Sequence, residues 1–289
     1  MGTSKSYGGP TDTKQLLPAW AQNPEGMDAA PDQAGAAEAT PDEAASTGND
    51  ETTPPPGQAV SVTEQPWRAA KIRLGRAAHS GARGDLRSAG EAYVRARGGA
   101  KGASGAARAG RKATASLAGF LSGIATGGVG AALERAGLAQ FVGRDQAAVF
   151  AAITNALAPA GASTEEAAAR HATAAVVEEL YERFSVETNG LERLNAMNAD
   201  DVRDAIESSI AKYIYFRWLG ELCQRVEDKS VSGAQAERLE REMKAYVRDI
   251  VRLDLKAVDV LKLDWSGMAA ARLLSDLYEQ AYSVLGGPA

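Results

Sequence analysis

The chain has 289 residues, enough for one or two domains, and a formal net charge of −5. Its single cysteine, Cys223, excludes an intramolecular disulfide and a zinc site built from cysteines. The two histidines, His79 and His171, are too far apart in sequence for metal-ligand spacing. The sequence does not open on an apolar secretory signal, so we expect a cytoplasmic protein.

Charge is distributed in two adjacent blocks of opposite sign. Residues 21–65 contain nine acidic residues and no Lys or Arg, whereas residues 66–112 contain twelve basic residues and two acidic ones. Adjacent blocks of opposite sign indicate either self-screening or a partner that displaces one block.

Residues 1–20 are too short and polar to fold alone, yet they are not of low complexity. Gly2 follows the initiator Met, so methionine removal would leave a free α-amine on a compact residue. We predict that this segment is a tail that a partner recognises or modifies, with Gly2 as the modified residue. The predicted partner-binding residues are the small, irregular and apolar ones: Thr3, Ser4, Ser6, Gly8, Gly9, Pro10, Leu16, Leu17, Pro18 and Trp20.

The next two segments are predicted to differ in order. Residues 21–65 are rich in Ala, Pro, Asp and Glu and cannot bury enough apolar surface to offset ordering entropy, so we expect a disordered acidic linker. Residues 66–112 are predicted to be partly helical, with broken helices near 66–80 and 85–97 and a flexible stretch from Gly98 to Gly110. The basic residues that could contact nucleic acid or an acidic partner here are Arg68, Lys71, Arg73 and Arg76.

Residues 113–133 carry no charge, and Gly119, Gly123 and Gly127 line one helix face with small side chains. This is the length and the packing pattern of a transmembrane helix. The segment is rich in Gly and Ala, however, so we favour a soluble helix packed closely against a neighbour, broken at Gly127–Gly128.

The rest of the chain shows helical periodicity, with an apolar residue recurring every three or four positions. A capping box at Ser163 and Glu166 starts one helix, and Asn198 caps the strongest helix, 199–227, which we expect to be central. Ser232 should open a helix that continues to about residue 256. The predicted fold class is all-α, with a helical bundle domain over residues 113–289 and a last helix starting at Asp264 or Ser266.

No catalytic constellation emerges, so we predict a protein that is not an enzyme and uses no cofactor. The glycines near 123–130 lack the Lys-Ser/Thr ending of a phosphate loop. Cys223 lies in the predicted central helix without a nearby histidine, which is typical of a buried structural thiol.

The opening MGTSKSYGGP with LLPAW at 16–20, and the stretch DLKAVDVLKLDWSGMAAARLLSDLYEQAYSVLG at 254–286, resemble the two ends of QatB family proteins. That family belongs to Qat anti-phage defence systems of bacteria. The resemblance implies a non-enzymatic subunit with a QueC-like enzyme (QatC-type), an ATPase (QatA-type) and a TatD-like nuclease (QatD-type) as neighbours. QueC enzymes adenylate a carboxylated deazaguanine, and defence relatives are associated with attaching a deazaguanine to an N-terminal glycine.

Two other functions are left open by the sequence. The chain could be a scaffold or nucleic-acid-binding adaptor that acts through residues 66–112, in which case Gly2 is incidental. It could also be a membrane-acting effector, a reading that depends on residues 113–133 alone.

Overall fold

The computed structural model describes residues 64–141, 146–184, 186, 190–222 and 232–287. All regular structure in these residues is helical, which confirms the all-α prediction. The helices are α1 Glu64–Ser80, α2 Arg83–Ala96, α3 Gly99–Gly105, α4 Arg108–Arg135, α5 Gln146–Leu157, α6 Thr164–Arg183, α8 Ala199–Leu222, α10 Gly233–Ile250 and α11 Met268–Leu285, with short 3₁₀ turns η2 Ala139–Phe141 and η3 Leu191–Ala196.

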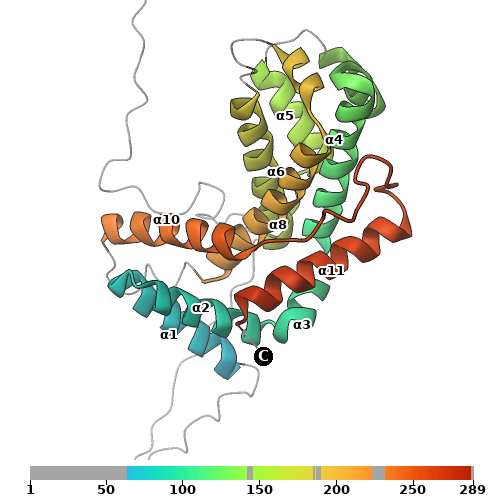
Figure 1. Cartoon of the computed structure of the whole chain (residues 1–289). Coiled ribbons are helices and arrows are strands. Elements are labelled where there is room, and N and C mark those ends of the chain that lie inside the picture. Colours follow the sequence, from blue (N-terminus) through green and yellow to red (C-terminus); the bar gives the residue numbers. More distant parts are fainter. Residues whose placement is uncertain (1–63, 142–145, 185, 187–189, 223–231, 288–289) are drawn as a thin grey trace, which may run out of the picture.

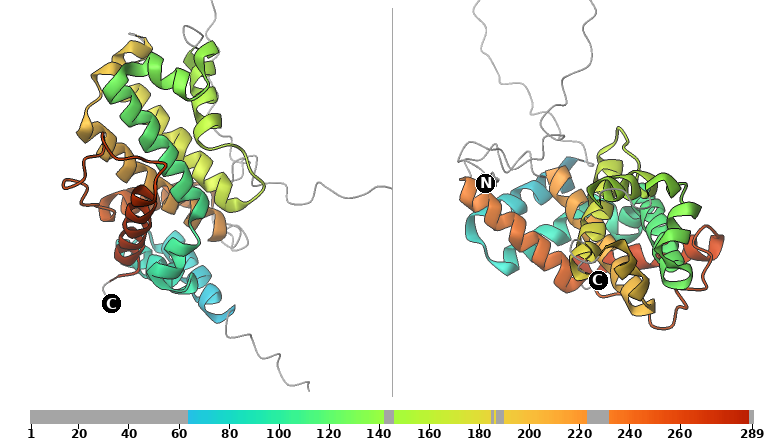
Figure 2. Two further views of the ribbon diagram at one scale, coloured as in Figure 1. Left: turned by 90° about the vertical axis from the view of Figure 1, so that its right-hand side faces the viewer. Right: turned by 90° about the horizontal axis from the view of Figure 1, so that it is seen from above.

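The helices form two groups that share α8 and α11. Helices α4, α5, α6 and α8 run alongside one another, whereas α1, α2 and α10 form a second group that lies across one end of them (Figure 1). Helix α11 contacts α4 and α8 of the first group and α2 and α10 of the second, and it also packs against α3. The views in Figure 2 show the same division from the side and from above.

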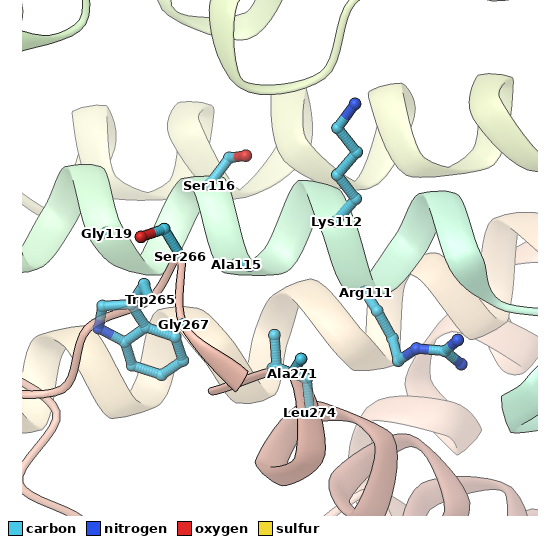
Figure 3. A pocket seen from close by; sticks show the side chains of 10 residues that line it. All are labelled: Arg111, Lys112, Ala115, Ser116, Gly119, Trp265, Ser266, Gly267, Ala271 and Leu274. Atoms are coloured by element: carbon cyan, nitrogen blue, oxygen red, sulfur yellow. The ribbon is translucent and has the colours of Figure 1, made fainter. Parts of the chain in front are cut away.

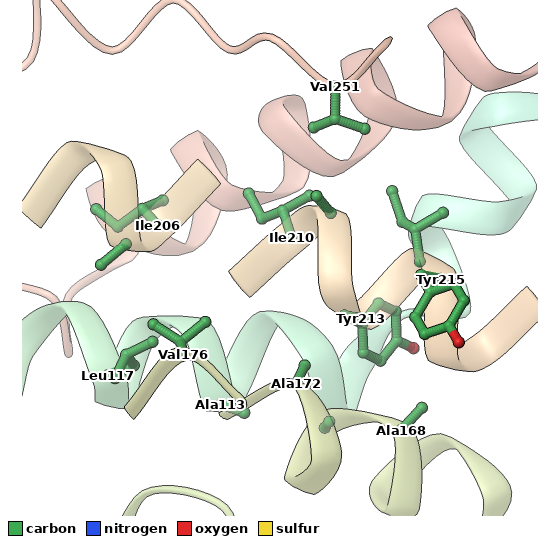
Figure 4. Close-up of a cluster of buried hydrophobic side chains, with 14 of the residues drawn as sticks. Ala113, Leu117, Ala168, Ala172, Val176, Ile206, Ile210, Tyr213, Tyr215 and Val251 are labelled. Carbon is green, nitrogen blue, oxygen red and sulfur yellow. The ribbon is translucent and has the colours of Figure 1, made fainter. Parts of the chain in front are cut away.

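Helix α8 is central, as its apolar pattern predicts. Its apolar positions cover more than one stripe, so it can be buried on several sides, and it contacts α1, α4, α6, α10 and α11. Ile206, Ile210 and Tyr213 are almost completely buried, in the same core cluster as Leu117 of α4 and Val176 of α6 (Figure 4). Asn198 caps this helix by accepting hydrogen bonds from the Asp200 and Asp201 backbone N–H groups, at 2.8 and 3.2 Å.

Helix α4 carries the predicted break. Gly128 has φ +84° and ψ 161°, a conformation that interrupts the helix and that glycine adopts without a steric penalty. The Val129 N–H, which the break frees from the helix, donates to Asn195 Oδ1 of η3 at 2.7 Å. A neighbouring element therefore supplies the hydrogen-bond acceptor that the helix no longer provides. The predicted capping box of α6 is present as well, with Ser163 and Glu166 bonded reciprocally.

Residues 98–110, predicted to be flexible, are instead mostly helical. They form α3 and the start of α4, and Ala103 and Ala107 are fully buried. The Ser104 hydroxyl donates to the Ser275 carbonyl of α11 at 3.0 Å. Small residues allow these helices to approach α11 and α8 closely. This packing between distant segments stabilises the helices, and composition alone does not reveal it. The predicted domain boundary between residues 112 and 113 falls within α4. The division of the chain into these domains stays a prediction.

The helix predicted from Ser232 to about residue 256 ends earlier, at Ile250. The Glu207 carboxylate of α8 accepts from the Leu253 backbone N–H at 2.9 Å and from Arg252 Nη1 at 3.2 Å. In a helix that continued past Ile250, the Leu253 N–H would bond to the carbonyl four residues earlier in the chain. Here the Glu207 carboxylate accepts that N–H instead, so the segment after Ile250 leaves the helix. Residues 21–63 of the predicted disordered linker, and residues 223–227 of the predicted central helix, lie outside the described residues. The last two residues of the predicted linker, Glu64 and Gln65, are instead the first residues of α1.

A glycine substitution tests the close packing between α4 and α8. A Cβ at Gly110 would lie 2.7 Å from the Tyr213 ring, whereas a Cβ at Gly84 would meet nothing within 4 Å. We expect Gly110→Ala to lower the free energy of unfolding by about 1–3 kcal/mol through overpacking. Gly84→Ala should raise it by roughly 0.5 kcal/mol, because alanine favours helix. Urea denaturation measures both, and equal effects would contradict the packing described.

Candidate functional site: a buried charge network and two grooves beside α4

The N-terminus of α4 receives a carboxylate from another helix. Glu165, in the first turn of α6, accepts a hydrogen bond from the Ala109 backbone N–H at 2.6 Å. An acidic group at this position favours the helix because it satisfies a free N–H and complements the helix dipole. This matters because α4 has no acidic residue in its own first turn.

Glu165 is one end of a charge network, which we define as Glu165, Tyr213, Arg217, Glu221 and Arg97. Arg217 Nη1 donates to the Tyr213 hydroxyl at 2.7 Å and lies 3.8 Å from Glu165 Oε1. The same Glu221 oxygen, Oε1, accepts from Arg217 Nε at 2.5 Å and from Arg97 Nη1 at 3.0 Å. The network therefore connects α6, α8 and the C-terminal end of α2.

The charge network is enclosed by other helices. The side chains of Arg217, Glu221 and Arg97 are only 8, 14 and 12% exposed. Burial raises the pKa of the Tyr213 hydroxyl well above its usual value, so Tyr213 is a neutral hydrogen-bonding group here. A buried ion pair is stable only when its members stay together, because removal of one partner leaves an uncompensated charge.

Several buried polar atoms beside the charge network have no hydrogen-bond partner within the described residues. They are the Tyr93 and Tyr282 hydroxyls, Trp218 Nε1, Arg97 Nε and Nη2, and Glu221 Oε2. Burial also raises the pKa values of the Tyr93 and Tyr282 hydroxyls, which keeps both protonated. Most of these atoms are hydrogen-bond donors, so this interior is richer in donors than in acceptors.

Two grooves flank the first half of α4. The first groove, of about 420 Å³, lies between α4 and the chain from Trp265 to Leu274 (Figure 3). Apolar side chains and two glycines form much of it, and Arg111 and Lys112 leave α4 on opposite sides. The second groove, of about 340 Å³, lies between α4, the end of α5 and the start of α6, and its lining includes Arg108, Lys112, Leu157 and Pro159.

The floor of the first groove is fixed by hydrogen bonds. Trp265 Nε1 donates to the Ser122 hydroxyl at 3.1 Å and to the Val260 carbonyl at 3.0 Å. Gly119 faces the Trp265 side chain, and a Cβ there would lie 3.3 Å from the Trp265 Cβ. Of the three glycines that suggested a packing face in α4, Gly119 lies against the tryptophan that borders this groove, whereas Gly123 and Gly127 face the Arg135 side chain.

The described residues contain no group of three or more His, Cys, Asp or Glu that could hold a metal ion. His171 lies against the Phe216 ring, 5.4 Å between centroids, and burial lowers its pKa. A half-buried histidine packed against an aromatic ring fits a structural role. Cys223 lies outside the described residues.

The predicted site residues fall in two places. Gly2 and the tail residues through Trp20 lie outside the described residues. Of the basic set, Arg68 and Arg76 are exposed on α1, Lys71 is half-buried, and Arg73 donates to the Ser88 hydroxyl at 2.5 Å. The structure does not place these four residues in either groove.

Sequence reasoning did not identify the charge network. One signal was available, because Tyr213, Arg217 and Glu221 follow one another at spacings of four on a strongly apolar helix. Nothing local indicated that Glu165 and Arg97, from distant parts of the chain, would join them.

Among the described residues, one helix, α4, is long and apolar enough to cross a membrane. Half of its most apolar window is buried against the rest of the protein. A core helix of a soluble protein has the same properties, so this observation favours neither possibility strongly.

Removing the shared carboxylate tests the charge network. Glu221→Gln would leave Arg97 and Arg217 without their common counter-charge, so we expect the free energy of unfolding to fall by about 3 kcal/mol. The matched control is Asp249→Asn, which removes the carboxylate of an exposed pair with Arg83. It should cost less than about 1 kcal/mol. Chemical denaturation measures the free energy of unfolding of both variants. Equal decreases would show that the buried network stabilises the fold no more than an exposed ion pair does.

The fold and these sites can be compared with known proteins. Searches of curated proteins and of solved structures found no match. The family described as Qat anti-phage system associated protein QatB matches residues 98–285, which span α3 to α11 and include most of the charge network and both grooves. The chain therefore belongs to the QatB family and is a component of a Qat anti-phage defence system, whose other components are its partners.

Proposed function

We propose that this chain is a non-catalytic subunit of its defence complex, and that a QueC-like partner (QatC-type) conjugates a deazaguanine to its N-terminal glycine. The observation that carries the proposal is the family membership of residues 98–285. It is supported by the tail pattern at the other end of the chain, where Gly2, Gly8-Gly9-Pro10 and Leu17-Pro18-Ala19-Trp20 occur together.

The chemistry requires an unhindered amine, and Gly2 would supply one after methionine removal. An α-amino group has a pKa of about 7.7–8.0, so a useful fraction is unprotonated at neutral pH. Adenylation by ATP activates the carboxyl group of the deazaguanine and releases pyrophosphate. The Gly2 nitrogen then attacks the activated carbonyl carbon, an amide bond forms, and AMP and a proton leave.

The proposal assigns a role to each segment. Residues 3–20 form the recognition segment that enters the enzyme, and residues 21–65 are the tether. The helical body binds the ATPase (QatA-type), with the TatD-like nuclease (QatD-type) as a further partner, and the complex acts in the cytoplasm.

Mass spectrometry of the protein co-expressed with its genomic neighbours tests the modification. We expect a mass excess located on Gly2 that disappears when the QueC-like partner is omitted. Replacing Gly2 with a bulky residue, as in Gly2→Trp, should abolish both the mass excess and protection from phage, because the amine becomes hindered or stays capped by Met1.

The matched control is Gly2→Ala, which still permits methionine removal and adds one methyl group beside the amine. It should reduce the modified fraction less than Gly2→Trp does. Unmodified Gly2 in a fully protective complex would contradict the proposal.

A scaffold or nucleic-acid-binding adaptor is the second candidate. Arg68 and Arg76 favour it, because both are exposed on α1 and form no ion pair within the described residues. If the adaptor function is correct, the double variant Arg68→Glu/Arg76→Glu should lose protection from phage. If our first proposal is correct, that variant should keep its modification at Gly2. Arg73 is unsuitable for this test because its contact with Ser88 links α1 to α2.

The membrane-effector function depends on α4 alone. Fractionation of cells expressing the full complex tests it, and we expect the protein in the soluble fraction. Recovery in the membrane fraction would instead favour α4 as a membrane-inserting helix.

A further inference from the structure

The start of α4 departs from the usual charge pattern of a helix. Arg108, Arg111 and Lys112, which we call the basic turn, lie within its first five residues, and no acidic residue accompanies them. Cations at a helix N-terminus are unfavourable because the helix dipole is positive there. A local rule broken without local compensation is a common sign of a functional surface.

The fold compensates for this departure only in part. Glu165 binds the Ala109 N–H, and Arg111 donates from Nη1 to the Ser104 carbonyl. Arg108 and Lys112 remain exposed and form no direct ion pair within the described residues, although Lys112 is near enough to the exposed Glu166 to contribute to the lowered pKa of that carboxyl group. Two positive charges are therefore available to an acidic group from outside the helical body.

The surroundings of the basic turn define what could bind there. Lys112 borders both grooves, Arg111 borders the first and Arg108 the second. Trp265, Ala271 and Leu274 give the first groove apolar surface. Figure 3 shows these three residues on one side of α4 and the Lys112 side chain on the other side. The site thus fits an extended segment that presents a large apolar side chain and, close by in sequence, several carboxylates.

We propose that residues 16–32 of this same chain dock there, with the apolar cluster Leu16-Leu17-Pro18-Ala19-Trp20 in the first groove. The acidic residues Glu25, Asp28 and Asp32 then lie along the basic turn and pair with Arg108 and Lys112. Charge complementarity supports this choice, since residues 21–63 contain acidic residues and no Lys or Arg.

The length of the connecting chain permits this docking. The 43 residues from Ala21 to Thr63 can span on the order of 140 Å when extended. A compact body of the size described has a diameter of about 45 Å. A segment tethered at this length also has an effective concentration that reaches the millimolar range, which favours the chain's own tail over a second copy.

Docking of this segment would give the tail two alternative states. In one, residues 16–32 lie on the helical body; in the other, a partner has withdrawn them. The interaction is independent of any modification at Gly2, because it uses residues 16–32 and needs no partner enzyme. A bare Gly2 in the mass experiment would therefore leave this inference untouched.

Photo-crosslinking of the full-length chain expressed alone tests the docking. Trp20 is replaced by the photoreactive apolar residue p-benzoylphenylalanine, and the products are sized and mapped by mass spectrometry. We expect a product of monomer mass that joins position 20 to residues 108–119 or 265–274.

Charge reversal in the basic turn should reduce that product. We expect Arg108→Glu/Lys112→Glu to lower the crosslinked fraction about tenfold, because attraction to the acidic residues becomes repulsion. This variant should stay folded, since acidic residues suit the first turn of a helix. The matched control, Arg68→Glu/Arg76→Glu, makes the same charge change on α1 and should leave the crosslink in place.

A second variant tests the groove without changing charge. Ala271 borders the first groove and is exposed, so Ala271→Trp would fill the groove while a thermal melt checks that the fold persists. It should reduce the crosslink to the groove residues. A product of dimer mass, crosslinks elsewhere or none, or equal losses in the α4 and α1 charge variants would overturn the proposal.

Discussion

The arrangement of the helices depends on one chain of buried charges. Glu165 caps α4 from the first turn of α6, Arg217 lies between Glu165 and Glu221, and Glu221 also binds Arg97 at the end of α2. Arg217 is buried and the other charges are largely shielded from solvent, so each requires its neighbour, and these contacts link four helices where they meet. The two groups of helices therefore behave as one body at this point, although their axes lie across one another (Figure 1).

The same interaction has a consequence at the surface. Because Glu165 caps α4 from outside, α4 needs no acidic residue of its own and can carry Arg108, Arg111 and Lys112 at its start. The grooves on both sides then have basic residues at their border, and the second groove is also lined by the acidic Glu165 and Glu166. A structural contact in the core thereby permits a charged surface that a lone helix would disfavour.

The family match covers the helical body from α3 to α11, whereas the proposed chemistry belongs to the tail. The matched residues, 98–285, contain α4, the charge network except Arg97, and both grooves. A tail that is modified by one partner and a body that binds others would divide the work within a single chain. The acidic and basic blocks that the sequence places side by side fit such a division, because one block can compete with partners for the other.

The sequence by itself determined the all-α class, the central helix with its Asn198 cap, the capping box at Ser163 and the break at Gly128, because caps, glycine conformations and apolar periodicity act within a few residues. Only the tertiary structure decided that residues 98–110 are mostly helical, that the helix from Ser232 ends at Ile250, and that Glu165 and Arg97 join Arg217 and Glu221. Those outcomes depend on contacts between distant segments: Ser104 with α11, Glu207 with Leu253, and carboxylates with guanidinium groups across helices. Local patterns carry no information about such pairings, since each partner alone is an ordinary polar residue on a helix.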